Sequence, residues 1–199
     1  MDALFLIGIA VFVVSSLYFL ITQRKPFNTA FLVSFITIAS YVVMYEGTFA
    51  SVSTATVPIF WTRWVFYAIS CTLLTVEISR ILNIEKKKSI FLLYLTAIVM
   101  LTGALSSYYT GTFMLVFYVI SSFAFLLLLI GFLSSPSEHR GAVSKYLYFG
   151  WTGFAVVFLF SPEGFGVIEN LVAASIFLLL DVFTKIVFYI EFKKKAPAN

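Results

Sequence analysis

The fold is decided by the stretch Leu178-Leu179-Leu180-Asp181-Val182-Phe183-Thr184-Lys185-Ile186-Val187-Phe188. It lies in a run apolar enough to cross a bilayer, and Asp181 and Lys185 are the only charges there. A charge at membrane depth costs about 2.5–3.5 kcal/mol on insertion scales, so such a residue normally faces the inside of a helix bundle and has a partner. The i, i+4 spacing puts both side chains on one helix face. We therefore expect the pair to lie inside a bundle.

Lys185 admits two interpretations on this helix alone. A lysine held in an apolar pocket can be a neutral amine, and a neutral amine attacks an aldehyde to form a Schiff base. Alternatively, Asp181 and Lys185 form a structural pair that only locks the packing of the helices. The rest of the chain has to separate these alternatives.

The composition indicates a membrane protein. The 199 residues are 61% hydrophobic and 11% charged, with a mean hydropathy of +1.04, which no soluble globular domain shows. Seven spans of about 22 residues would use roughly 155 residues. Apolar runs of the required length begin near Ala3, Phe27, Phe60, Ile90, Thr112, Tyr146 and Asn170. We predict an all-α membrane protein, a bundle of seven transmembrane helices in which residues 1–199 form a single domain.

The basic residues predict the orientation of this bundle. Eleven of the thirteen lysines and arginines follow the first, third, fifth and seventh spans: Arg24, Lys25, Arg80, Lys86, Lys87, Lys88, Arg140, Lys145, Lys193, Lys194 and Lys195. Only Arg63 and Lys185 lie within spans. The positive-inside rule then places the C-terminus in the cytoplasm and the N-terminus outside a multi-pass protein of the cell membrane. The first span, Ala3 to Ile21, follows Asp2 rather than a basic region and is expected to be a retained helix, not a signal peptide.

The net charge and the single cysteine and histidine exclude several kinds of partner and of functional site. The net charge of +4 reflects topology and attraction to an anionic leaflet of the lipid bilayer, not nucleic-acid binding. Cys71 and His139 are the only residues of their types. We therefore expect no disulfide, no metal site and no enzymatic activity.

The third span carries a polar stripe. At 100° per residue, Arg63, Phe66, Ser70 and Glu77 fall on one helix face, and Glu77 lies about 21 Å further along than Arg63. Such a stripe usually lines a wet path or a buried site. Each member also has a structural alternative: Arg63 as an interfacial anchor, Glu77 as a surface partner of Arg80, and Ser70 as a serine bonded to its own helix. Cys71 can be a small packing residue.

Aromatic residues form a face on the sixth span. Trp151, Phe154 and Phe158 stand at i, i+3 and i+7, which suits either helix packing or the wall of a pocket for a long planar polyene. The loop from Gly47 to Val57 is rich in Thr, Val and Ser and is predicted to be a short extracellular hairpin.

Four features together resemble the microbial rhodopsins: the seven predicted spans, the N-terminus outside, Asp181-x-x-x-Lys185 on the last span and Arg63 on the third. In that family the lysine of the seventh helix carries all-trans retinal as a protonated Schiff base, which here would be Lys185. The motif Trp151-x-x-Phe154-Ala155-x-x-Phe158 is similar to the family's Trp-x-x-Tyr-Pro-x-x-Trp, with departures at residues 154, 155 and 158. The resemblance implies the following cofactor-binding residues: Lys185, Tyr67, Tyr118, Ser121, Phe125, Trp151, Phe154 and Phe158.

The residue types at three positions indicate the subfamily; these positions follow Arg63 by three, seven and fourteen residues. The triplet Phe66, Ser70 and Glu77, with Cys71 beside the serine, resembles the schizorhodopsins, whose members are light-driven inward proton pumps and whose family forms trimers. With Phe66 unable to supply a counter-charge, Asp181 is the single nearby anion and is expected to be the counterion. Glu77 would aid proton release to the cytoplasm, with reprotonation from outside past Arg63.

Two rival functions remain from the sequence. A photosensor would use the same photocycle to signal to a partner protein. A seven-span transporter without a chromophore would use Asp181 and Lys185 as a charge relay.

Overall fold

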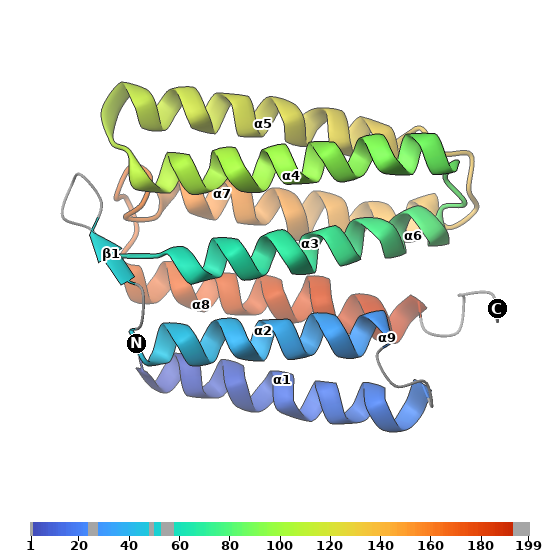
Figure 1. The fold of residues 1–199 in the computed structure, drawn as a ribbon, viewed down its shortest axis with the longest axis horizontal. Coiled ribbons are helices and arrows are strands. Elements are labelled where there is room, and N and C mark those ends of the chain that lie inside the picture. The colour runs from blue at the N-terminus through green and yellow to red at the C-terminus, as the bar shows by residue number, and fades with distance from the viewer. Residues whose placement is uncertain (1, 24–27, 48–49, 53–57, 193–199) are drawn as a thin grey trace.

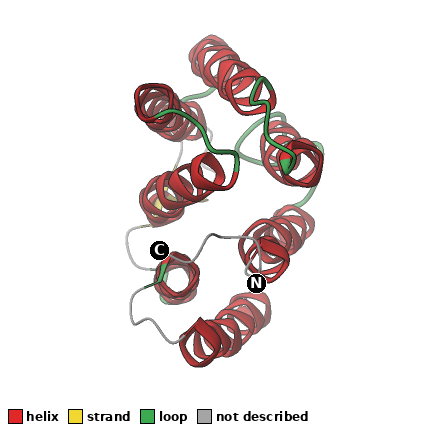
Figure 2. Cartoon of the chain, turned by 90° about the vertical axis from the view of Figure 1, so that its right-hand side faces the viewer, coloured by secondary structure: helices red, strands yellow, loops and turns green. Residues whose placement is uncertain are grey.

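The computed structural model describes residues 2–23, 28–47, 50–52 and 58–192. They form seven helical segments side by side with roughly parallel axes (Figures 1 and 2). The first five are α1 (Asp2–Gln23), α2 (Thr29–Tyr45), α3 (Trp61–Ile81), α4 (Lys86–Tyr108) and α5 (Gly111–Leu133). The sixth combines α6 (Arg140–Lys145), the π-helix η1 (Tyr146–Trp151) and α7 (Thr152–Phe160), and the seventh combines α8 (Asn170–Asp181), η2 (Val182–Val187) and α9 (Phe188–Phe192).

Six of these segments are long and apolar enough to cross a membrane. The exception is α2, which is apolar but has 17 residues, the lower end of the range that spans a bilayer. The predicted seven-helix architecture is therefore confirmed. Large apolar side chains point outward, among them Ile21 on α1 and Phe123 on α5, as expected for a surface that faces lipid rather than water.

A short β-hairpin joins α2 to α3, as predicted. Strand β1 (Ala50–Val52) pairs antiparallel with β2 (Pro58–Phe60), with Ala50 opposite Phe60. The second strand begins one residue beyond the predicted loop and displaces the start of the third helix to Trp61. Gly47, just past α2, has a φ of 65°, a left-handed conformation that glycine adopts without steric cost.

The two ends of the bundle differ in charge. We call the end with the β-hairpin the hairpin end; the turn between α7 and α8 lies there as well (Figure 1). The opposite end, here the basic end, carries the described cations of the loops and nearby helix turns: Arg80, Lys86, Lys87, Lys88, Arg140 and Lys145. The other predicted loop cations, Arg24, Lys25 and Lys193 to Lys195, lie outside the described residues.

Both the sixth and the seventh segments contain a π-helical stretch, which the sequence did not predict. The two stretches, η1 and η2, pack against each other, with the Tyr146 and Phe183 rings stacked at 4.7 Å between centroids. A Cβ atom at Gly150 would lie 2.3 Å from Cγ2 of Thr184. The glycine therefore permits a close approach next to Lys185, which lies within η2.

This close contact yields a stability prediction with an internal control. Gly150→Ala should destabilise the protein by about 1–3 kcal/mol, because the added methyl group overpacks the interface. Gly141→Ala, on the open face of α6 where no atom lies within 4 Å of the added Cβ, should be neutral or stabilising by about 0.5–1 kcal/mol. Thermal unfolding in detergent measures both, and equal shifts in the two variants would contradict the packing argument.

Candidate functional site

The centre of the bundle holds the ion pair between helix-seven residues. Nζ of Lys185 lies 2.7 Å from Oδ1 of Asp181, and the two side chains are only 3% and 0% exposed. Asp181 ends α8 and Lys185 lies one turn later in η2. The structure thus places both charges inside the bundle, where neither is solvated and each depends on the other.

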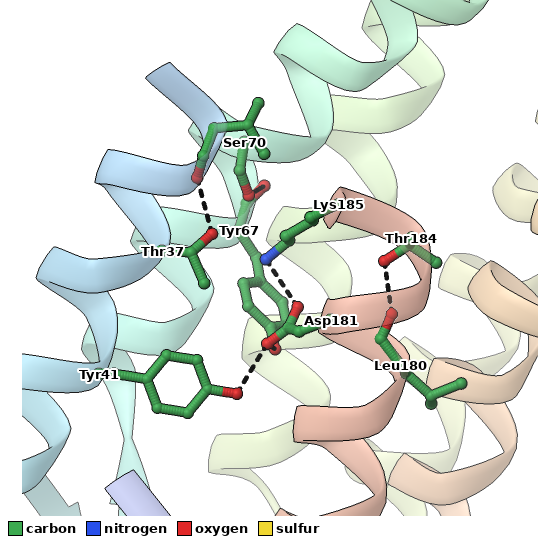
Figure 3. A network of polar contacts seen from close by, with 9 residues as sticks. Thr37, Tyr41, Tyr67, Ser70, Leu180, Asp181, Thr184 and Lys185 are labelled. Carbon is green, nitrogen blue, oxygen red and sulfur yellow. Dashed lines mark hydrogen bonds and ion pairs between the residues drawn. The ribbon is translucent and has the colours of Figure 1, made fainter. Parts of the chain in front are cut away.

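Two tyrosines complete the surroundings of the carboxylate. Tyr41 of α2 donates a hydrogen bond of 3.0 Å to Oδ2 of Asp181, and Tyr67 of α3 donates one of 2.8 Å to the same oxygen (Figure 3). The Tyr67 ring also lies 4.2 Å from Nζ of Lys185, within cation–π range. Charge-assisted hydrogen bonds of this kind stabilise a buried anion, and side chains from α2, α3 and η2 together surround the Asp181 carboxylate.

The ion pair lines an apolar cavity of about 120 Å³. Its walls come from α3, α4, α5, η1, α7, α8 and η2, and all eight residues expected to bind a cofactor line it. The lining residues are Arg63, Trp64, Tyr67, Cys71, Leu74, Thr96, Val99, Met100, Gly103, Tyr118, Ser121, Ser122, Phe125, Leu128, Trp151, Phe154, Ala155, Phe158, Phe177, Asp181, Thr184 and Lys185.

The aromatic face of the sixth segment serves both of its predicted uses. Phe154 stacks on Phe177, and Phe158 stacks on Tyr118, so the rings pack the helices together. Trp151 meets Phe132 edge-on. Because Trp151, Phe154 and Phe158 also line the cavity, packing fixes the position of the rings that form its wall.

The cavity fits a long apolar aldehyde bound to Lys185. Among the described lining residues the only amine is Nζ of Lys185, which lies beside a carboxylate that can balance a cationic linkage, and most of the remaining lining is aliphatic or aromatic. At Gly103 an added Cβ would come within 2.6 Å of the Trp64 ring, so this glycine makes room for one of the walls. Retinal has the required aldehyde and polyene, and these residues would hold it.

The residues of the polar stripe on α3 have different surroundings and do not all line one cavity. The Ser70 hydroxyl is buried and donates to the Tyr67 carbonyl at 3.4 Å, its structural alternative. Cys71 lines the cavity, whereas Phe66 is absent from the described lining. Glu77 lies 3.6 Å from Arg80, with its side chain 16% exposed, near the basic end. The stripe thus divides between the cavity and the two ends of the bundle.

Arg63 is more than an interfacial anchor. Its guanidinium forms a 2.5 Å ion pair with Glu163, and the two side chains are 11% and 8% exposed. The same guanidinium lies 4.7 Å from the centre of the Phe177 ring. Glu163 belongs to the turn between α7 and α8. The sequence did not predict this partner, because Arg63 and Glu163 are 100 positions apart and no local pattern links them.

His139 lies at the basic end, with Nε2 at 3.5 Å from Oε1 of Glu138. No group of three or more His, Cys, Asp or Glu residues able to hold a metal ion occurs within the described ranges.

Comparisons with known proteins agree with this geometry. A family model described as bacteriorhodopsin-like protein matches residues 1–190. Among solved structures, schizorhodopsin 4 is 35% identical with a TM-score of 0.89, covering 96% of each chain. Cyanorhodopsin from Calothrix sp. NIES-2098 (19% identity, TM-score 0.88, 98% of this chain and 93% of that one) and the thermophilic rhodopsin of Rubrobacter xylanophilus (20%, 0.89, 98% and 96%) share the fold. Comparison with curated protein sequences gives no match.

The Arg63–Glu163 pair should show strong energetic coupling. Arg63→Gln and Glu163→Gln should each destabilise the retinal-free protein by about 3–5 kcal/mol, because each leaves one buried charge unpaired. The double variant should lose clearly less than the sum of the two. The pair Glu77–Arg80, whose arginine side chain is 69% exposed, provides the control cycle and should show a coupling below about 1 kcal/mol. Thermal unfolding in detergent gives both cycles, and additive losses at Arg63 and Glu163 would contradict the pairing.

Proposed function

Because the chain belongs to the bacteriorhodopsin-like family, we propose that it is a light-driven inward proton pump that carries all-trans retinal on Nζ of Lys185. Members of this family are ion pumps or photoreceptors that bind retinal through a Schiff base to a lysine. The observation that carries the proposal is the buried Lys185–Asp181 pair in the lining of an apolar, aromatic-walled cavity. Residues 1–199 would act as one retinal-binding unit in the bilayer, assembled as a trimer as the resemblance implies.

Retinal bound to Lys185 would supply a light-driven isomerisation, and Nζ of Lys185 would hold the proton that this change reorients. In the dark, Asp181 balances this positive charge. Its Oδ1 atom contacts Nζ, while the hydroxyls of Tyr41 and Tyr67 occupy Oδ2. Asp181 is therefore the proposed counterion, and its partners keep it fixed while the proton moves.

The positions of the other charged groups favour release towards the basic end. Phe66 stands where a carboxylate acceptor would lie on the hairpin side, and it cannot take a proton. On the other side, Glu77 lies near Arg80 with its carboxylate partly exposed. A carboxylate there attracts a proton that leaves Nζ, and the proton then reaches the loops that carry the lysines and arginines.

The charge asymmetry supports an inward direction. By the positive-inside rule the basic end lies in the cytoplasm, so a proton leaving past Glu77 enters the cell. The replacement proton would come from the hairpin end, past Arg63 and Asp181. The similarity to schizorhodopsin 4 over nearly the whole chain supports the same direction, since the schizorhodopsins it resembles pump protons inward.

Retinal binding at Lys185 has a direct test. Purified protein mixed with all-trans retinal should develop a visible absorption band, and Lys185→Ala should develop none, because it lacks the amine that forms the linkage. Lys185→Arg is the matched control, since it keeps a cation beside Asp181 without a nucleophilic amine. A visible band in Lys185→Ala would refute the proposal, and no band in the wild type would favour a transporter without a chromophore.

The direction of transport has a separate test. Illuminated cells in unbuffered medium should make the medium more alkaline, and a protonophore should abolish the signal. Glu77→Gln nearly preserves side-chain volume but removes the charge, so it should keep the visible band and lose most of the transport. Acidification by the wild type would reverse the direction. An intact photocycle without any pH change would favour a photosensor.

A further inference from the structure

A second, smaller cavity lies at the hairpin end, separated from the first by two side chains. It has a volume of about 30 Å³, enough for a water molecule. Arg63 and Phe177 line both cavities. Because the guanidinium of Arg63 rests on the Phe177 ring at 4.7 Å, these two side chains form the wall between the hairpin end and the Lys185 cavity.

Glu163 holds Arg63 in this position and faces the smaller cavity. One carboxylate oxygen, Oε1, pairs with the guanidinium. The other, Oε2, is buried and has no hydrogen-bond partner among the described residues. The polar side chains that share the cavity with it are Ser161, Asn170 and Arg63. An unpartnered buried oxygen is costly in a folded protein, and here it is available to accept a proton from water.

The four buried charges balance only while Nζ of Lys185 is protonated. In the dark, Lys185 balances Asp181 and Arg63 balances Glu163. Once Nζ loses its proton, a single cation, Arg63, remains for two buried carboxylates. An uncompensated buried charge is strongly unfavourable. The site then attracts a proton, and of the two buried carboxylates Glu163 lies nearer the hairpin end.

We propose that Glu163 is the proton-uptake group of the pump and that its ion pair with Arg63 closes the hairpin-end route until Nζ has released its proton. This inference rests on the proposed function. Arg63 then turns from Glu163 towards Asp181, and Oε2 of Glu163 accepts a proton from water. That proton passes to Nζ, Glu163 becomes an anion again, and Arg63 returns. One proton enters for each proton released, and no other reactant is needed.

Flash photolysis tests the role of Glu163. In Glu163→Gln the visible band should persist and Nζ should lose its proton at the wild-type rate. Its reprotonation should be slower on the order of 100-fold, because positioned acids contribute factors of about 10²–10⁴. Glu169→Gln is the matched control: this glutamate stands six residues further along, is exposed, and makes no side-chain cap bond. Its reprotonation rate should match the wild type, and Glu163→Asp should restore most of the rate.

An infrared measurement provides a readout that does not depend on transport. During reprotonation of Nζ, the wild type should show a transient C=O stretch of a protonated carboxylic acid. The band should be absent in Glu163→Gln, displaced in Glu163→Asp, and retained in Glu169→Gln. This measurement on the wild type and Glu163→Asp decides the question even where Glu163→Gln does not assemble.

The outcomes separate this inference from the proposed function. Less than tenfold slowing in Glu163→Gln, faster reprotonation, or an unchanged infrared band would each overturn the role of Glu163. In all three cases a visible pigment that alkalinises the medium would leave the proposed function intact. Failure of the wild type to bind retinal would instead overturn both.

Discussion

The rest of the structure depends on the ion pair between Lys185 and Asp181 at the centre of the bundle. Neither side chain has solvent contact of any consequence, so each charge must be compensated inside the protein. The compensation draws on three segments: Lys185 and Asp181 from the seventh, Tyr41 from α2 and Tyr67 from α3. These contacts fix α2 and α3 against the last segment, and with them one side of the cavity. The need to compensate two buried charges thus sets how α2 and α3 pack against the seventh segment in a largely apolar bundle.

The backbone conformation of the sixth and seventh segments also helps to position Lys185. Lys185 lies in a π-helical stretch that packs against a second one containing Gly150 and Trp151. π-Helical stretches occur frequently at functional sites, because they turn side chains out of the regular helical register. Here Lys185 of η2 and Trp151 of η1 both line the cavity, and the Nζ atom of Lys185 lies 4.2 Å from the centre of the Tyr67 ring. The packing that gives the lysine its position is therefore specific to this pair of segments.

Much of this organisation could be predicted from the sequence, and the reasons are physical. Spans were found because lipid requires every backbone polar group to be satisfied within a helix. The helix-seven pair was found because an i, i+4 spacing has one geometric meaning. The contact of Tyr41 with Asp181 was not predicted, because the two residues are 140 positions apart. The contact of Glu163 with Arg63 was not predicted for the same reason, with a separation of 100 positions. The π-helical stretches escaped because they arise from packing between two segments, and β2 was missed because Pro58–Phe60 continues the apolar run of the third span.

The arrangement of carboxylates, rather than the ion pair itself, distinguishes the two sides of the membrane. Both oxygens of Asp181 are already engaged by Lys185, Tyr41 and Tyr67, and protonation of Asp181 would remove the charge that these groups stabilise. Asp181 is also the only carboxylate in the described lining of the cavity. On the hairpin side, Glu163 lies outside this lining and is paired through Oε1 with Arg63. Glu77, towards the basic end, has a side chain that is 16% exposed and lies 3.6 Å from Arg80. Under the proposed function, the interactions that make a buried lysine tolerable would thus also bias its proton towards the basic end.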